Sequence, residues 1–228
     1  MNVDVIILAK TSNLELYGMT QRTIQSLWLS ERNYNFHINI VESNPNYLDQ
    51  GFIYNNCTVI TPTSEFGYNK FLNHGLRRCN HDWVIIANND LIFTQEWFTD
   101  MMKWRIDNPG IYSLSPWEPN WHLKRGLDPN HGPYFGYRPA FEITGWCLVM
   151  TRDLIEKCEL FDPDFEYWYQ DNDYALTLQK HGYKHVLLPQ SRVYHMVSGT
   201  LHELDPNKKE HMTDGQINVL RRKWGPNV

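Results

Sequence analysis

An apolar run that ends in two amides and a carboxylate occupies residues 83–90, Trp-Val-Ile-Ile-Ala-Asn-Asn-Asp. Val84 to Ile86 are typical of a strand that is buried on both faces, as the strands of parallel sheets are. Ligands of open α/β sheets bind just beyond the carboxyl ends of such strands. Asp90 therefore stands where a divalent cation and a phosphate group can meet, because Mg²⁺ and Mn²⁺ take carboxylate and phosphate oxygens as ligands. The alternative is that Asn88 to Asp90 form an ordinary polar turn.

The elements that must position these residues alternate between strand and helix. Four strands are predicted from apolar runs at residues 5–8, 36–41, 57–60 and 83–87. Helices are predicted between and after them from apolar residues at helical spacing, and Thr94 is expected to cap the helix that carries Trp97, Met101 and Trp104. This order predicts an α/β fold with a mostly parallel sheet and helices on both faces.

Length and composition narrow the class of protein. The 228 residues, of which 42% are hydrophobic, suit one globular domain. No apolar stretch approaches the roughly 18 residues needed to span a bilayer, and the first residues lack the features of a signal peptide. The four cysteines show no C-x-x-C spacing, so no zinc site or redox pair is indicated. We therefore expect a cytoplasmic protein, and the net charge of −5 argues against a surface that coats nucleic acid.

The alternation breaks between Ser115 and Pro139, where five prolines and three glycines crowd the sequence. Neither a helix nor a long strand is expected to persist there. Structureless segments of this length in compact domains are usually lids or binding loops. Its aromatic residues either anchor the segment to the core or stack on a sugar or a base; they are Trp117, Trp121, Tyr134, Phe135 and Tyr137.

A second block of motifs runs from Glu142 to His195. It contains Leu-Phe-Asp-Pro at 160–163, Tyr-Gln-Asp-Asn-Asp-Tyr at 169–174, His-Gly-Tyr at 181–183 and Val-Tyr-His at 193–195. In this order, after the strand that ends in Asn-Asn-Asp, the segments resemble the family-2 type glycosyltransferases. The resemblance covers almost the whole chain from Val5 to His195. It implies the GT-A fold, a Rossmann-like and mostly parallel sheet flanked by helices.

The resemblance also implies an activity and its cofactors. The expected reaction is an inverting transfer of a sugar from a nucleoside-diphosphate sugar, most simply a UDP-sugar, to an acceptor hydroxyl, with Mn²⁺ or Mg²⁺. Residues 1–114 are then the nucleotide-sugar-binding half of a single domain, and residues 115–228 are the acceptor-binding and catalytic half. Residues expected to line the nucleotide pocket are Ala9, Lys10, Thr11, Glu42, Asn69, Asn88 and Asn89. Among these, Glu42 is placed on the base or the ribose.

The remaining roles follow from the same comparison of motifs. Asp90 and His195 correspond to the metal ligands, and Asp171 corresponds to the catalytic base, with Asp173 as a competitor for that role. Residues expected on the acceptor side are Trp121, Tyr134, Tyr137, Gly145 and Trp146.

Two departures from the family pattern affect the chemistry. Asn88 replaces the first aspartate of the Asp-x-Asp motif, which removes one negative charge from the metal site. Gln170 replaces the glutamate beside the base, and a neutral neighbour does not raise the pKa of Asp171 as a second carboxylate does. Both replacements together also fit a non-catalytic carbohydrate-binding protein with a decayed site. A nucleotidyltransferase is disfavoured, because residues 8–13 offer no Gly-rich basic loop.

The acceptor divides the expected function into two alternatives. Small relatives either glycosylate cell-surface saccharides or, in bacteriophages, decorate hydroxymethylated pyrimidines in DNA. The brevity of the chain and its Asn- and Tyr-rich composition resemble the phage group, which favours hydroxymethylated duplex DNA as acceptor in a host cytoplasm. A DNA acceptor requires a flipped base and phosphate contacts. The basic residues available for these contacts are Lys124, Arg125, Arg138 and Arg221 to Lys223, although the last three also suit a helix end.

Overall fold

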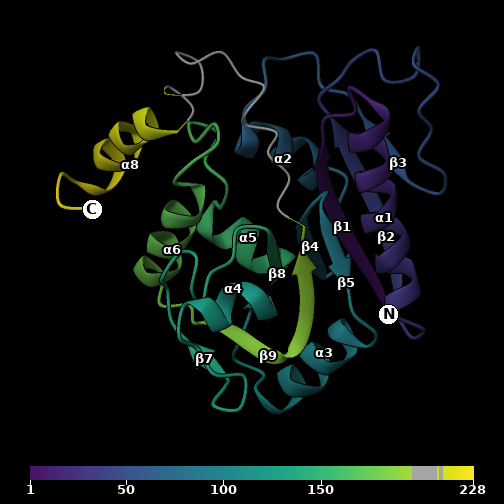
Figure 1. Ribbon diagram of the computed structural model, residues 1–228. Helices are drawn as coiled ribbons and strands as arrows, with labels where there is room; N and C mark the ends of the chain where they lie inside the picture. Colours follow the sequence, from purple (N-terminus) through teal and green to yellow (C-terminus); the bar gives the residue numbers. More distant parts are fainter. Residues whose placement is uncertain (197–209, 211–212) are drawn as a thin grey trace.

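A computed structural model of the chain describes residues 1–196, 210 and 213–228. Its centre is a nine-stranded sheet with the order β3-β2-β1-β4-β8-β6-β9-β5, in which β7 also pairs with β9 (Figure 1). The strands are β1 (Asn2–Ala9), β2 (Asn35–Glu42), β3 (Thr58–Ile60), β4 (Trp83–Asn88), β5 (Leu91–Phe93), β6 (Ser113–Trp117), β7 (Tyr134–Phe135), β8 (Cys147–Thr151) and β9 (His185–His195). The helices are α1 (Leu14–Ser30), α2 (Tyr68–Leu76), α3 (Trp97–Asp107), α4 (Pro119–Lys124), α5 (Arg152–Cys158), α6 (Gln170–Lys180) and α8 (Ile217–Trp224), with a 3₁₀ turn at Asp214–Gln216.

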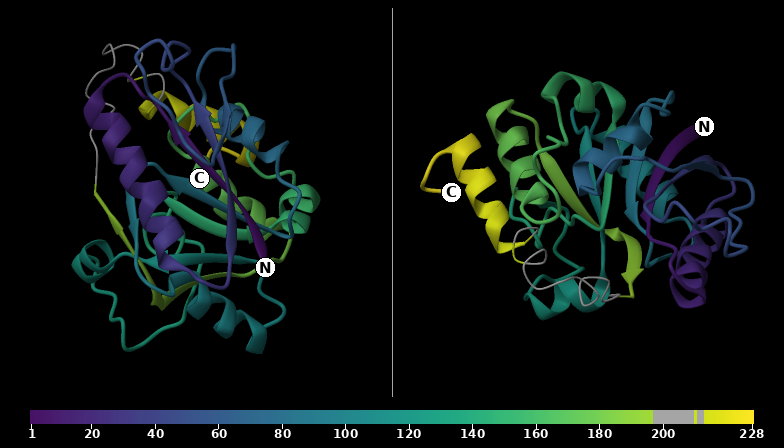
Figure 2. Two further views of the ribbon diagram at one scale, coloured as in Figure 1. Left: turned by 90° about the vertical axis from the view of Figure 1, so that its right-hand side faces the viewer. Right: turned by 90° about the horizontal axis from the view of Figure 1, so that it is seen from above.

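The first four strands form the parallel part of the sheet. β1 pairs in parallel with both β2 and β4, and β2 pairs in parallel with β3. The four strands predicted from apolar runs are therefore confirmed, with ends that differ by three residues at most. The later strands make the sheet mixed, because β8 is antiparallel to both β4 and β6, and β9 is antiparallel to β5 and β7. The result is an α/β fold with a mixed, mostly parallel sheet between two layers of helices (Figure 2).

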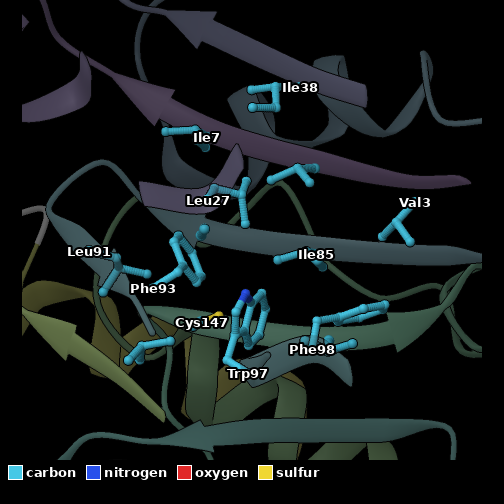
Figure 3. Close-up of a cluster of buried hydrophobic side chains, with 14 of the residues drawn as sticks. Val3, Ile7, Leu27, Ile38, Ile85, Leu91, Phe93, Trp97, Phe98 and Cys147 are labelled. Atoms are coloured by element: carbon cyan, nitrogen blue, oxygen red, sulfur yellow. The ribbon is translucent and has the colours of Figure 1, made fainter. Parts of the chain in front are cut away.

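Alternation along the strands explains why their sequences are apolar on both faces. Val5 and Ile7 of β1 pack with α1 and α3, while Ile6 between them packs with α2 on the opposite face. β4 follows the same pattern, since Ile85 joins the first cluster and Ile86 joins the second. Successive side chains of a strand point to opposite faces, so a strand covered on both sides needs apolar residues at every position. Trp97, Phe98 and Leu27 fill the space between the sheet and helices α1 and α3 (Figure 3).

Helix α3 shows that the predicted cap at Thr94 was wrong. The helix begins at Trp97, and its N-cap is Glu96, which has a positive φ of 60° and makes no capping hydrogen bond with its side chain. The free backbone N–H groups are satisfied from elsewhere: the Glu31 carboxylate accepts from Phe98 N at 2.7 Å and from Thr99 N at 2.9 Å. A cap supplied by a residue so distant in sequence leaves no local signal, and this is why the sequence pointed to Thr94.

The Pro-rich segment at 115–139 is also more ordered than predicted. It contains the end of β6, the short strand β7 and helix α4, which begins at Pro119. Proline is tolerated at the first helical position because its missing N–H is not needed there. The Glu118 side chain caps the helix by accepting from Trp121 N. Over the residues that the structure describes, no helix is long and apolar enough to cross a membrane.

Candidate active site

The carboxyl ends of three parallel strands meet at one edge of the sheet. The register pairs Ala9 at the end of β1 with Glu42 at the end of β2, and Leu8 with Asn88 at the end of β4. The antiparallel strand β8 begins beside the same edge, so that Asn88 N donates to the carbonyl of Trp146 at 2.8 Å. Residues far apart in sequence are therefore brought together where open α/β sheets bind ligands.

A pocket of about 200 Å³ opens at this edge. Its lining residues are Tyr68, Asn88, Ala140, Gly145, Trp146, Tyr167, Trp168, Gln170 and Asp171. Of the residues singled out from the sequence as site residues, the pocket brings together Asn88, Gly145, Trp146 and Asp171. The sequence reasoning missed Tyr167 and Trp168, although an aromatic run just before the expected catalytic aspartate is a signal that marks a pocket wall.

Asp90 and His195 form a pair beside the pocket. The pairing of Leu91 with His195 between β5 and β9 sets them side by side, and His195 Nε2 lies 3.1 Å from Asp90 Oδ1. The imidazole also stacks on Trp146, with ring centroids 5.1 Å apart. Asp90 is buried, and the His195 side chain is 18% exposed. The pair offers one carboxylate and one imidazole on a surface next to the pocket.

The donor set of this pair fits a divalent cation in part. In the described part of the chain, no group of three or more His, Cys, Asp and Glu side chains gathers as a metal site. Mn²⁺ accepts both imidazole nitrogen and carboxylate oxygen, and cations of this kind commonly complete their coordination with water and substrate phosphates. Asp90 and His195 therefore suit a metal that the protein holds through two side chains.

Asp171 is the one carboxylate among the described pocket-lining residues. It lies in the first turn of α6, and its Oδ1 accepts a hydrogen bond from Asn172 N at 3.0 Å. Burial raises the pKa of Asp171, and the backbone hydrogen bond opposes this shift. Gly145 lies directly beside this carboxylate, since a Cβ at that position would be in ordinary contact with Asp171 Oδ2, at 3.7 Å. A carboxylate with a raised pKa that faces a pocket is suited to accept a proton.

Asp173 lies outside the pocket, although it belongs to the same helical turn. Its side chain is buried, with the carboxylate 2.9 Å from Lys223 Nζ and 2.7 Å from Trp224 Nε1. Burial raises the pKa of Asp173, while the hydrogen bonds from Lys223 and Trp224 lower it. The Asp173 carboxylate therefore binds side chains of helix α8, whereas the Asp171 carboxylate faces the pocket.

Several residues expected on the nucleotide have contacts within the protein. Glu42 is fully buried, and its carboxylate accepts from Thr11 N at 3.0 Å, Thr11 Oγ1 at 2.5 Å and Asn44 N at 2.7 Å. Asn69 is also fully buried and donates to the carbonyl of Asp162 at 2.9 Å. In the structure, Glu42 joins the loops that follow β1 and β2.

Of three further residues expected on the nucleotide, two have side chains that are buried or face a helix, and one is exposed to solvent. Asn89 donates its side-chain amide to Thr20 Oγ1 of α1 at 3.0 Å, so it faces the helix. Ala9 is buried at the end of β1, whereas Lys10 is exposed at the start of the following loop. Lys10 is therefore the member of this group whose side chain reaches the surface of the sheet edge.

The aromatic residues expected on the acceptor are held by the protein. Trp121 packs edge-on against Trp146 and donates to the carbonyl of Ala140 at 2.8 Å. The Tyr134 hydroxyl donates to the carbonyl of Asp128 at 2.6 Å, and the Tyr137 hydroxyl donates to the carbonyl of Tyr183 at 2.9 Å. None of these three lines the pocket.

Three of the six basic residues considered for phosphate contacts form ion pairs with carboxylates of the described part of the chain. Lys223 binds Asp162 and Asp173, and Arg222 lies 3.0 Å from Asp164. Arg138 forms an ion pair with Glu142, and the Arg125 guanidinium stacks 3.7 Å over the Trp121 ring. These pairings reduce the positive charge that the surface offers to a nucleic acid.

The comparison with protein families now decides the class. The sequence model described as Glycosyl transferase family 2 matches residues 5–161. The chain belongs to this family. The matched region includes the Asn88–Asp90 motif and the Gly145–Trp146 segment, and it ends before Asp171 and His195. A comparison with curated proteins finds no significant match.

Two solved structures have the same fold as this chain. GalNAc-T7 with UDP, GalNAc and Mn²⁺ superposes with a TM-score of 0.67 at 14% identity, covering 86% of this chain and 44% of that one. The mannosyltransferase PcManGT from Pyrobaculum calidifontis, in complex with GDP-Man and Mn²⁺, gives a TM-score of 0.61 at 17% identity, covering 87% of this chain and 57% of that one. The chain thus has a GT-A-like fold and spans about half the length of each of these proteins.

Proposed function

We propose that this family-2 glycosyltransferase moves a sugar, with inversion, from a nucleoside-diphosphate sugar to a hydroxyl of a saccharide acceptor. The observation that carries the proposal is the position of Asp171. Its carboxylate faces a pocket at the carboxyl edge of the sheet, and the Asp90–His195 pair lies beside that pocket. In this proposal the sugar lies between the Asp171 carboxylate and a diphosphate site at the Asp90–His195 pair.

The donor binds at the ends of β1, β2 and β4. Lys10 is exposed there, at the start of the loop that follows β1, and its side chain can contact a phosphate, while Glu42 supports the pocket by holding Thr11 and Asn44. Asp90 and His195 would hold Mn²⁺ or Mg²⁺ on the diphosphate side of the site, and a cation bound there would neutralise charge that develops on the leaving diphosphate. The two similar structures contain UDP or GDP-Man with Mn²⁺, which supports a nucleotide-sugar donor, with UDP-sugars tested first.

Asp171 acts as the general base in a single displacement. As the acceptor oxygen forms its bond to the anomeric carbon, Asp171 takes the hydroxyl proton. The bond from the anomeric carbon to the diphosphate oxygen breaks at the same time, and its electron pair leaves with the nucleoside diphosphate. Asp173 has no part in this step, because its carboxylate is bound to Lys223 and Trp224.

The pocket wall favours a saccharide acceptor. Trp146, Tyr167 and Trp168 line the space around Asp171, and aromatic rings offer apolar faces on which a sugar ring can pack. The DNA alternative needs free basic residues near the site, but Arg138, Arg222 and Lys223 are engaged in ion pairs. Salt dependence separates the two acceptors, because each phosphate contact on duplex DNA adds about 0.9 to the log–log salt slope.

The test is an assay of donor consumption and acceptor modification. The protein is incubated with Mn²⁺ and a panel of UDP- and GDP-sugars, with oligosaccharides or hydroxymethylated duplex DNA as acceptors, and released nucleoside diphosphate is measured. Mass spectrometry of both acceptors then identifies the product. We expect a mass increase of one sugar on an oligosaccharide and none on the duplex.

Three outcomes contradict parts of the proposal. Release of no nucleoside diphosphate from any donor supports the alternative of a carbohydrate-binding protein with a decayed site. Modification of the duplex, with binding that weakens steeply with salt, overturns the saccharide acceptor while leaving the transferase assignment in place. Equal turnover by the Asp171→Asn variant removes the base assignment.

A further inference from the structure

We propose that the C-terminal helix α8 positions the catalytic carboxylate, and that Asp173 is the positioning residue through which it acts. The inference rests on the proposed function of Asp171. It assigns a role to residues that the transfer reaction itself does not use, since Asp173, Lys223 and Trp224 all lie outside the pocket.

The segment that α8 contacts forms one wall of the pocket. We call residues 162–173 the wall segment; it runs from the Asp-Pro motif into the first turn of α6. Tyr167, Trp168, Gln170 and Asp171 of this segment all line the pocket. Most of the wall segment precedes the helix and forms no strand, so its position depends on what packs against it.

Contacts from the C-terminal region reach the wall segment along its length. Gln216 Oε1 accepts from Glu166 N at 3.0 Å, and Arg222 lies 3.0 Å from Asp164. Lys223 Nζ bridges two carboxylates, at 2.8 Å from Asp162 and 2.9 Å from Asp173. Seen from above, α8 lies next to α6 (Figure 2, right). The wall segment is thus fastened at its start, its middle and its end.

The opposite side of the wall segment is held by the start of α2. Tyr68 N donates to the carbonyl of Glu166 at 2.5 Å, and the Asn69 side chain donates to the carbonyl of Asp162 at 2.9 Å. The wall segment therefore lies between α2, which adjoins the pocket, and α8, which lies away from it. Loss of the α8 contacts removes the polar attachments on that side and leaves those made by α2.

Burial makes the Asp173 contacts stronger than the others. The Asp173 side chain is 3% exposed and that of Lys223 is 32% exposed, whereas those of Arg222 and Asp164 are 68% and 63% exposed. Exposed ion pairs contribute little to stability, but removing one partner of a buried pair leaves a charge without compensation. Trp224 adds a second donor to the same carboxylate, at 2.7 Å from Oδ1.

Helix geometry transmits this attachment to Asp171. Residues two positions apart on an α-helix point about 200° away from each other, because 3.6 residues make one turn. Asp173 consequently holds one side of the first turn of α6 to α8, while Asp171 on the other side faces the pocket. A shift or rotation of this turn moves the Asp171 carboxylate relative to the acceptor.

The decisive experiment compares Lys223→Met with Arg222→Met. Both substitutions remove a cation of α8 that pairs with the wall segment, but only the first removes a partner of Asp173. Two properties are measured on each full-length variant and on the wild type. The first is amide hydrogen exchange of residues 166–174. The second is activity and donor-site binding: kcat is measured with the donor and the acceptor that give turnover with the wild type, and the Kd is measured for UDP with Mn²⁺.

We expect Lys223→Met to speed exchange in residues 166–174 and to lower kcat by about 10- to 10²-fold, since small misplacements of catalytic groups have effects of this size. The Kd for UDP stays within about twofold, because the side chains of α8 bind Asp162, Asp164 and Asp173, whereas the proposal places the nucleotide at the ends of β1, β2 and β4. Arg222→Met behaves as wild type in both measurements. Lys223→Arg keeps the charge and is expected to retain most of kcat. Trp224→Phe removes only the indole N–H donor to Asp173 and is expected to lower kcat less than Lys223→Met does; it replaces Lys223→Met in the test if that variant does not fold.

Each contrary outcome has one meaning. Unchanged exchange in both Lys223→Met and Trp224→Phe overturns the attachment of the wall segment by α8. Faster exchange with unchanged kcat overturns the positioning role and leaves a structural contact only. If the wild type turns over no donor, the proposed function fails, and the exchange measurement still decides whether α8 holds the wall segment.

Discussion

Replacement of Asp171 by asparagine removes the proposed base while keeping the size of the side chain. The amide retains an oxygen that accepts from Asn172 N, as the carboxylate does at 3.0 Å. Gly145 leaves space on the pocket side, since even a Cβ at that position would lie 3.6 Å from Asp171 Cβ, so the substitution introduces no clash. The variant therefore differs from the wild type in its ability to take a proton, and in little else.

The expected loss in kcat is about 10²–10⁴-fold, the usual contribution of general base catalysis. This corresponds to about 2.7–5.4 kcal/mol of transition-state stabilisation, at about 1.36 kcal/mol for each factor of ten. The Kd for UDP with Mn²⁺ is expected to stay unchanged, because the proposal assigns the diphosphate side of the site to Asp90 and His195 and not to Asp171.

The pH dependence follows from the direction of the pKa shift. Burial raises the pKa of Asp171 above 3.8, and the base acts only when it is ionised. In the wild type, kcat/KM therefore falls as the pH drops through this raised pKa, and the fall begins at a higher pH than for an ordinary aspartate. The folded-state pKa of Asp171 lies above its unfolded-state value, so the folded protein favours the protonated carboxyl group. The resulting contribution to the free energy of unfolding is fully present at low pH and is lost as the pH rises through the folded-state pKa. At neutral pH, Asp171→Asn is expected to unfold at a temperature no lower than the wild type.

Steady-state release of nucleoside diphosphate, measured over about pH 4–9, gives kcat and kcat/KM for both proteins, and thermal unfolding at neutral pH gives the stability comparison. The reasoning is refuted if Asp171→Asn turns over at the wild-type rate. A marked drop in the unfolding temperature of the variant would contradict a different step of the reasoning, because it would show that the Asp171 side chain stabilises the fold.

Three further substitutions test the metal site and the core. Asp90→Ala is expected to weaken Mn²⁺-dependent UDP binding by more than about 100-fold. Loss of a residue that only supports a metal ligand costs roughly 10–100-fold, and loss of the ligand itself costs more. Wild-type affinity of the variant in calorimetry would contradict the metal assignment. Asn88→Asp adds a carboxylate at the pocket and is expected to tighten Mn²⁺ binding; unchanged affinity places Asn88 away from the metal. Gly75→Ala is expected to destabilise the fold by about 1–3 kcal/mol in urea unfolding, because the new Cβ would lie 2.6 Å from Ile6 Cγ2 in the core. Gly18→Ala in α1 is the matched control, with only Arg22 Nη1 at 3.6 Å, and equal effects at the two glycines would refute the packing argument.

The strands of the parallel half were predictable because their signal is local. β1 and β4 are covered on both faces, and this requires continuous apolar residues that the sequence displays directly. The insertion of β8 beside β4 left no such signal, because an antiparallel partner more than fifty residues away is chosen by tertiary packing. The cap of α3 by Glu31 was missed for the same reason.

The candidate site was predictable in its motifs and less so in its contacts. The resemblance assigned Asp90 and His195 to one metal site, and the structure places their side chains 3.1 Å apart. It assigned Asp171 to the base and Gly145 to the acceptor side, and both residues line the same pocket. Helical spacing was available to separate Asp171 from Asp173, since the two cannot face the same side of a helix. That Lys223 and Trp224 are the partners of Asp173 depended on where α8 folds back, which no local pattern in the C-terminal residues specifies.

The stereochemistry of the product tests the central claim most directly. With an α-linked nucleoside-diphosphate sugar as donor, the proton NMR signal of the anomeric hydrogen in the product reports the configuration of the new bond. A single displacement with Asp171 as base predicts a β-linked sugar in the product. An α-linked product, formed with retention, would contradict the account, because one carboxylate placed to take the acceptor proton does not explain it.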